Sequence, residues 1–223
     1  VLTICLKSNP TLRITLTNMH TNILSSKQQE LLPLVKQFSD DFGLVGGTAI
    51  ALHLGHRRSI DFDLFRSTSF IIQNIRSTIM KMKKWKIEHT FIQGEGELTI
   101  LINQVKMTFF HFPYNLHFDD DFQGIIHIPD LLTLGAMKVF ALGHRAKWKD
   151  YVDLYFLFHQ FDLNELCKKA VELFGTQFNE KLFRVQLEYF TDIDYTEEVE
   201  FMEGFEVSQK EVHEYLKNIS LQE

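Results

Sequence analysis

A glycine pair and an aspartate pair, separated by the sequence of a short helix, constrain this chain more than any other feature. Gly46-Gly47 ends a short apolar run, and the following segment, residues 49–54, has helical propensity. The next apolar run alternates with Asp61 and Asp63, which is the pattern of a β-strand. Because residues i and i+2 of a strand point to the same side, the two carboxylates are predicted to project together.

The chemistry of these residue types points to a phosphate-handling site. Mg²⁺ prefers oxygen ligands and usually takes one or two carboxylates together with substrate phosphates, so Asp61 and Asp63 predict a Mg²⁺ (or Mn²⁺) site. Gly46-Gly47 lets a triphosphate approach the backbone, and the helix behind it, with Thr48 as the predicted N-cap, adds N–H groups and a favourable dipole. Together they predict phosphoryl or nucleotidyl transfer.

Each half of this pattern has a simpler interpretation when taken alone. A Gly-Gly pair is most often a turn, and an Asp-x-Asp pair is most often the solvated face of a strand. Thirteen residues with a helix among them separate Gly47 from Asp61, and that combination is much rarer than either pair. The combination therefore favours a functional site.

The rest of the first half predicts a sheet with flanking helices. Ser26 and Gln29 have the spacing of a capping box for a helix that contains Pro33 and ends at Gly43. Residues 69–84 have the apolar spacing of an amphipathic helix. Three extended runs follow, near 86–93, 98–103 and 105–112, and the tight connection at Gln104 predicts an antiparallel meander.

From Pro129 onward the pattern becomes helical. Helices are predicted from residue 129 and over 148–159, 164–174, 177–189 and 209–218, the last with Ser208 and Glu211 as a capping box. The predicted fold is α+β, with a mixed or antiparallel sheet flanked by helices. An irregular arm (1–24) precedes an α/β domain (25–128), and a helical domain (129–223) completes the active-site cleft. Phe109, Phe110 and Phe112 are interpreted as core residues.

Two blocks of the sequence carry a family resemblance. The run GGTAIALHLGHRRSIDFDLF, from Gly46 to Phe65, closely resembles the AbiEii/AbiGii-type toxin nucleotidyltransferases, a branch of the DNA polymerase β-like superfold. Residues 137–154 resemble the second block of that family, with its lysine on a helix and its basic residue-aspartate-x-x-aspartate pattern. The resemblance spans about residues 25–160.

The resemblance assigns roles to particular side chains. It implies that Asp61 and Asp63 hold the metal and that Lys138 neutralises phosphate charge or positions the nucleotide. Asp150 or Asp153 would act near the transferred group as metal ligand, base or orienting acid. The groups implied to bind the nucleotide are Gly46, Gly47, Thr48, Arg58, Ser59 and Lys138.

Two features leave alternatives open. Polymerase β-like enzymes commonly place a third carboxylate on a later strand, where this chain has Thr108. Either Asp150 or Asp153 supplies the missing charge, or the second metal is weak, or the enzyme is degenerate. The two aspartates lie three residues apart on one helical face and could instead form surface salt bridges with neighbouring basic residues.

Bulk properties set the expected location and partners. The net charge of −6 means that a nucleic acid would have to be met by a local basic patch. Cys5 and Cys167 have no metal or redox spacing and predict reduced thiols, and no secretory signal or membrane-spanning stretch is evident, so a soluble cytoplasmic protein is expected.

The leading hypothesis is therefore an NTP-dependent nucleotidyltransferase acting on an RNA (tRNA) or protein acceptor, the toxin of a toxin–antitoxin or phage-defence pair with a cognate antitoxin protein. The alternatives are a catalytically weak NTP-binding or scaffold protein of the same fold, and a small-molecule transferase of the aminoglycoside-modifying type.

Overall fold

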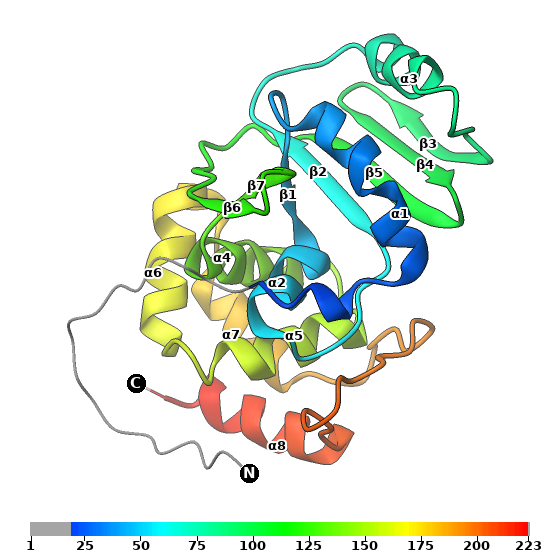
Figure 1. Ribbon diagram of the computed structural model, residues 1–223. Helices are drawn as coiled ribbons and strands as arrows, with labels where there is room; N and C mark the ends of the chain where they lie inside the picture. Colours follow the sequence, from blue (N-terminus) through cyan, green and yellow to red (C-terminus); the bar gives the residue numbers. More distant parts are fainter. Residues whose placement is uncertain (1–18, 223) are drawn as a thin grey trace.

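The computed structural model describes residues 19–222 and shows a sheet-containing part followed along the chain by a helical part (Figure 1). The predicted irregular arm up to residue 18, including Cys5, lies outside the described residues. The next residues form a 3-10 turn at Thr21–Ile23. The predicted α+β class is confirmed. In the described part of the chain, no helix combines the length and the hydropathy needed to span a membrane.

Five strands form one mixed sheet in the order β1-β2-β5-β4-β3. Their bounds are β1 Gly43–Val45, β2 Phe62–Arg66, β3 His89–Gly94, β4 Glu97–Ile102 and β5 Val105–His111. β3, β4 and β5 pair antiparallel, which confirms the predicted meander, whereas β2 pairs parallel with β5. Asn103 and Gln104, between β4 and β5, have φ angles of 51° and 60°, as a two-residue hairpin turn requires.

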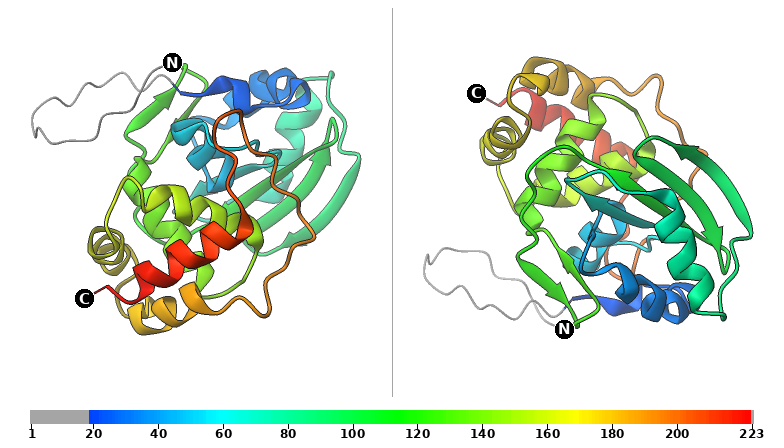
Figure 2. Two further views of the ribbon diagram at one scale, coloured as in Figure 1. Left: turned by 90° about the horizontal axis from the view of Figure 1, so that it is seen from below. Right: turned by 90° about the horizontal axis from the view of Figure 1, so that it is seen from above.

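The two faces of the sheet have different environments. On one face the side chains are fully buried and apolar, namely Phe62, Leu64, Leu98, Ile100, Met107 and Phe109. Helices α1 (Ser26–Val35) and α3 (Ile72–Lys81) lie on this side (Figures 1 and 2), and the ring of Phe38 stands 4.8 Å from that of Phe109. The alternate residues of β2, β4 and β5 face the helical part, and they include Asp63 and Thr108.

The helical part has the helices that the periodicity predicts. They are α4 Leu131–Leu142, α5 Trp148–Leu157, α6 Leu163–Phe174, α7 Glu180–Glu188 and α8 Gln209–Ser220. Helix α2 (Gly46–Leu54) packs against α4 and α5, so the element that begins at the glycine pair joins the two parts. Cys167 is buried in α6.

A small hairpin before α4 was not predicted. β6 (Asp120–Phe122) and β7 (Ile126–Ile128) are three-residue strands, too short to show an alternating pattern. The turn between them places Gln123 and Gly124 at positive φ, and β7 lies beside β1. Pro129 directly follows this hairpin, and the N-cap of α4 is Asp130, whose side chain accepts a hydrogen bond from Thr133 N at 2.7 Å.

Several predicted boundaries were wrong by a few residues. The capping box of α1 is Ser25 with Gln28, not Ser26 with Gln29. This helix ends at Val35 because a 3-10 turn follows, and Gly43 begins β1. Thr48 is not an N-cap: α2 begins at Gly46, and Thr48 lies within its first turn.

Candidate active site

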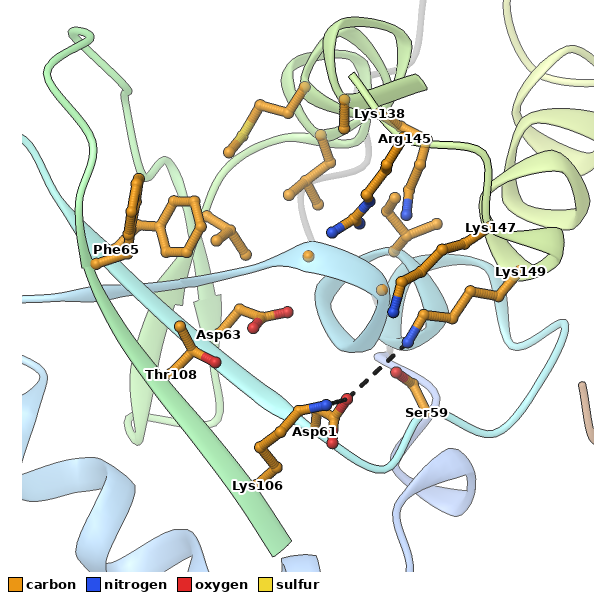
Figure 3. Close-up of a pocket in the computed structure, with 18 of the residues that line it drawn as sticks. Ser59, Asp61, Asp63, Phe65, Lys106, Thr108, Lys138, Arg145, Lys147 and Lys149 are labelled. Atoms are coloured by element: carbon orange, nitrogen blue, oxygen red, sulfur yellow. Dashed lines mark ion pairs between the residues drawn. The ribbon is translucent and has the colours of Figure 1, made fainter. Parts of the chain in front are cut away.

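A pocket of about 630 Å³ opens between the sheet and the helical part (Figure 3). Its size falls within the range of about 300–1,000 Å³ usual for small-ligand sites. The α/β part contributes the β1–α2 turn, the loop before β2 and one face of β2, β5 and β4, whereas the helical part contributes α4 and the segment 145–149. Both predicted sequence blocks therefore meet around one cavity.

The glycine turn and the aspartate pair lie against each other in this pocket. Antiparallel pairing of β1 with β2 sets Val45 opposite Asp63, so the next residue, Gly46, meets the Asp63 carboxylate. Gly46 has φ of 74°, and a Cβ atom there would stand 2.2 Å from Asp63 Oδ2. At Gly47 an added Cβ would stand 2.6 Å from Arg57 Nη2. Glycine is therefore needed at both positions for these side chains to reach the start of α2.

The two aspartates differ in their ionic partners. Asp61, directly before β2, lies 3.1 Å from Lys106 Nζ and 4.0 Å from Lys149 Nζ, as the dashed lines in Figure 3 show. Asp63 makes no ion pair within the described residues. Burial and the neighbouring Asp61 carboxylate together raise the pKa of Asp63. The pair thus holds negative charge that a cation would stabilise.

The residues present fit a hard divalent cation. Asp61 and Asp63 offer only oxygen donors, and Asp63 makes no ion pair within the described residues. Among residues 19–222 there is no group of three or more His, Cys, Asp or Glu side chains placed to hold a metal. A hard cation held by these two carboxylates would need further ligands, such as the substrate phosphates and water that Mg²⁺ usually takes.

Basic side chains dominate the polar lining of the pocket. Six of the lining residues are cationic, namely Arg57, Lys106, Lys138, Arg145, Lys147 and Lys149, against the three carboxylates of Asp61, Asp63 and Glu97. The protein as a whole carries a net charge of −6. A cavity that gathers six cationic side chains in an acidic protein can receive an anionic ligand.

A buried ion cluster lies behind this wall and joins the two parts of the protein. Asp153 on α5 accepts hydrogen bonds from Arg57 Nε at 2.7 Å and Arg57 Nη2 at 2.8 Å, and it forms an ion pair with Lys138 Nζ at 2.9 Å. His56 Nε2 lies 2.8 Å from the same carboxylate. Asp150 lies 2.6 Å from Lys138 Nζ and 2.9 Å from Arg145 Nε. Neither aspartate is exposed to solvent.

This cluster changes the predicted roles of three residues. Asp150 and Asp153 do not line the pocket, so the structure does not support their predicted contact with the transferred group. They are not surface salt bridges either, because both are fully buried. Lys138 reaches the pocket wall but is held between these two aspartates. Burial alone lowers the pKa of Lys138, but Asp150 and Asp153 outweigh it and raise that pKa.

Three other predicted nucleotide ligands have different surroundings. Thr48 is buried, and its hydroxyl donates to the backbone oxygen of Asp61 and lies 2.9 Å from Ser59 Oγ, so it positions the Asp61 segment. Ser59 lines the pocket as predicted. Arg58 does not line it, because its guanidinium donates to Glu200 at 2.7 Å. The neighbouring Arg57, which the sequence did not distinguish from Arg58, is the arginine at the pocket.

The position of the expected third carboxylate is occupied by Thr108. Thr108 on β5 stands opposite Asp63 on β2 and lines the pocket, where its hydroxyl lies 3.4 Å from Thr99 Oγ1 on β4. Glu97, two residues along β4, also lines the pocket, and its carboxylate lies 3.5 Å from Thr99 Oγ1. Glu97 was not predicted as a site residue, because the direction of its side chain depends on the strand pairing.

The other end of the pocket is apolar. Phe65 and Phe110 are paired across β2 and β5 with ring centroids 5.1 Å apart, and Phe112 stands 5.4 Å from Phe65. Phe109 is a core residue as predicted, but Phe110 and Phe112 are only partly buried and line the pocket. A flat ring can stack on such a wall.

Comparison with solved structures shows which known fold this chain resembles. A Helicobacter pylori protein whose crystal structure is described as that of a candidate nucleotidyltransferase has a TM-score of 0.53 and 15% identity, covering 87% of this chain and 91% of that one. JHP933 from Helicobacter pylori has a TM-score of 0.51 and 16% identity, covering 88% and 91%. At such low identity the likeness shows the fold, and this chain has the nucleotidyltransferase-like fold.

A relative with much higher sequence identity defines the family. The uncharacterized protein aq_aa25 of Aquifex aeolicus (strain VF5) is 31% identical over 212 residues, covering 87% of this chain and 98% of the relative. This chain belongs to the same family as that protein. No protein-family model matches the sequence, so the AbiEii/AbiGii resemblance stays a prediction.

Proposed function

We propose that this protein is a Mg²⁺-dependent nucleotidyltransferase that moves a nucleotidyl group from an NTP to an RNA (tRNA) or protein acceptor. The observation that carries the proposal is the contact of Asp63 with Gly46, beside Asp61, inside a cavity lined by six cationic side chains. The nucleotidyltransferase-like fold supports it.

Each part of the pocket has a role in this proposal. Asp61 and Asp63 would hold Mg²⁺, which when bound offsets phosphate charge and orients the phosphates for in-line displacement. The first turn of α2 presents backbone N–H groups at Gly46 and Gly47 to the phosphate tail. Lys106, Arg145, Lys147 and Lys149 offset the charge of the departing pyrophosphate.

The apolar end of the pocket has room for the base. Phe65, Phe110 and Phe112 offer ring faces and no hydrogen-bonding groups. Stacking on such rings tolerates any base because each base has a π-face. Base choice among the four NTPs is therefore expected to be weak on this wall.

The biological role is proposed from the sequence resemblance alone. The two blocks that resemble AbiEii/AbiGii-type enzymes support a toxin of a toxin–antitoxin or phage-defence pair, silenced by a cognate antitoxin protein. Growth arrest on expression of the wild-type chain, but not of the Asp63→Asn variant, is the result expected of a toxin.

A transfer assay tests the enzymatic proposal. Purified protein is incubated with Mg²⁺, each of the four NTPs labelled at the α-phosphate, and bulk tRNA or a protein extract. Label should enter an acceptor with the wild type and not with Asp63→Asn, while Asp40→Asn, an exposed aspartate outside the pocket, should behave as the wild type. Absence of transfer with every NTP and acceptor class would refute the proposal.

A second candidate is an NTP-binding protein without turnover, and the presence of Thr108 opposite Asp63 favours it. Titration calorimetry separates the two candidates. Mg²⁺-dependent NTP binding that requires Asp63 but labels no acceptor would support the binding protein. Label on a small aminoglycoside-type acceptor, with none on RNA or protein, would instead indicate a small-molecule transferase.

A further inference from the structure

An acidic segment outside the predicted motifs reaches the pocket. Residues 190–207 join α7 to α8 without a helix or an extended strand, and Figure 2 shows this segment in orange passing from the helical part to the α/β part. It contains seven carboxylates, namely Asp192, Asp194, Glu197, Glu198, Glu200, Glu203 and Glu206, and no lysine or arginine. We refer to residues 190–207 as the acidic strap.

Backbone hydrogen bonds anchor the acidic strap at two places. Asp194 N donates to Ala146 O at 2.7 Å, and Trp148 N donates to Asp194 O at 3.0 Å, which holds the strap at the start of α5. Further along, Arg58 N donates to Glu200 O at 2.8 Å, which holds it at the loop before β2. The span between these anchors is short, so the side chains within it have a defined position.

Glu197 lies in this span and pairs with two lysines of the pocket. One of its carboxylate oxygens accepts from Lys147 Nζ and the other from Lys149 Nζ. Burial alone raises the pKa of Glu197, but the hydrogen bonds from the two lysines outweigh it and lower that pKa to about 2. Glu197 is therefore ionised at any working pH and presents two anionic oxygens to two ammonium groups, as a phosphate group would.

Two other cations of the pocket, Arg57 and Lys138, are themselves buried and are not easily released from their partners. They pair with the buried Asp150 and Asp153. Such buried pairs cannot be broken without leaving a charge unpaired in the interior.

The Glu197 pairs are of a different kind. The side chains of Glu197, Lys147 and Lys149 are 38%, 31% and 22% exposed, and pairs that water reaches are weaker than buried ones and can exchange for another anion. Within the described residues, Lys147 has no other ion pair. Because the strap is held by its backbone, the Glu197 side chain can turn away without unfolding it.

We infer that Lys147 and Lys149 form a phosphate subsite of the pocket, and that Glu197 occupies this subsite until the polyphosphate of the substrate displaces it. The inference deepens the proposed function and rests on it for the identity of the substrate. It gives the protein a built-in competitor, which lowers the affinity for any ligand that carries phosphate at this position.

Glu197 could either compete with the ligand or position the two lysines for it, and these two roles predict opposite changes in anion affinity. If Glu197 only held the two lysines in place for the ligand, removing its charge would weaken anion binding. If it competes with the ligand, removing its charge strengthens binding. The direction of the change therefore separates the two roles.

Calorimetry with inorganic tripolyphosphate, without metal, tests the inference on the full chain. Glu197→Gln keeps the size of the side chain and should bind tripolyphosphate about three- to tenfold more tightly than the wild type, as the loss of two partly exposed pairs allows. Glu198→Gln is the matched control, because it removes the same charge from the neighbouring, exposed position of the strap. Its affinity should stay within about twofold of the wild type.

A double-mutant cycle locates the effect. In a Lys147→Gln background, the Glu197→Gln substitution should lose about half of its free-energy effect, since one of its two partners is gone and Lys149 remains. Unchanged or weaker binding by Glu197→Gln, an equal gain from Glu198→Gln, or no tripolyphosphate binding by any variant would overturn the inference. Tighter binding by Glu197→Gln in a protein that transfers no nucleotide would refute the proposed function and leave this subsite standing.

Discussion

Replacing Asp153 with asparagine keeps the size of the side chain but removes the negative charge on which Arg57, Lys138 and His56 converge. Asp153 is completely buried, its two oxygens accept from Arg57 at 2.7 and 2.8 Å, and one of them forms an ion pair with Lys138 at 2.9 Å. The asparagine amide would also turn an NH₂ donor towards groups that are themselves donors. The arginine and the lysine would then remain in the interior with only Asp150 as counter-charge.

The expected loss of folding stability follows from the cost of removing the charge of one partner in a buried ion pair. Such substitutions cost about 3–5 kcal/mol, which is a large share of the roughly 5–15 kcal/mol that stabilises a typical domain. Urea denaturation at pH 7, followed by circular dichroism, measures the change. Glu172→Gln is the control, because it breaks an exposed pair with Lys169 at 2.9 Å and should cost less than about 0.5 kcal/mol. A loss below about 1 kcal/mol for Asp153→Asn would refute the reasoning.

The pH dependence of stability checks the same cluster independently. Burial alone raises the pKa of Asp153, but Arg57 and Lys138 outweigh it and hold that pKa well below its usual range. The pKa of Asp150 is also lowered, by Lys138 and Arg145 against the effect of burial. A depressed pKa stabilises the fold above the ordinary carboxyl value of about 3.9, and this stability is lost as the pH falls through the folded-state value. Asp153→Asn should therefore lose less stability than the wild type on acidification below about pH 4.

Two further predictions concern single sites. Gly46→Ala should lower the free energy of unfolding by about 1–3 kcal/mol, because φ is 74° and the new Cβ atom would stand 2.2 Å from Asp63 Oδ2. Gly94→Ala is the control, because a Cβ atom at Gly94 would meet nothing within 4 Å. Equal losses of stability for the two variants in urea denaturation would contradict the reasoning. Burial raises the pKa of the Cys167 thiol to about 12, so its alkylation at pH 8, followed by mass spectrometry, should be on the order of 1,000-fold slower than in the unfolded chain; similar rates would count against a buried thiol.

Much of the fold could be predicted because its elements carry strong local patterns. Alternation along β5 and the Asn103-Gln104 turn determine the meander, and the apolar spacing of α4 to α8 determines the helical part. The hairpin β6–β7 could not be predicted because three-residue strands show no period. The predicted start of α1 was displaced by one residue because two candidate cap residues, Ser25 and Ser26, are adjacent in the sequence.

The site could be predicted where its chemistry is local in sequence. Asp61 and Asp63 share one side because they are two residues apart, and the strand pairing brings them to the adjacent glycine turn. The directions of Arg57 and Arg58 could not be predicted, because adjacent arginines in a loop carry no period. Arg57 points inward because its partner Asp153 is buried in the interior, and Arg58 points outward to Glu200 on the acidic strap. Both partners lie more than ninety residues further along the chain.

The same contacts explain how residues of the second sequence block, 137–154, influence the pocket. Lys138, Asp150 and Asp153 lie on α4 and α5, yet the group that Asp153 orients, Arg57, belongs to the loop between the glycine turn and the aspartate strand. Arg57 Nη2 stands where a Cβ atom of Gly47 would be only 2.6 Å away, so the ion cluster determines which side chain stands at the start of α2. A substitution in the second block therefore changes the pocket without touching a ligand. If the cluster were only structural, Asp153→Asn would lower stability and leave tripolyphosphate affinity intact, whereas coupling through Arg57 predicts that the affinity changes as well.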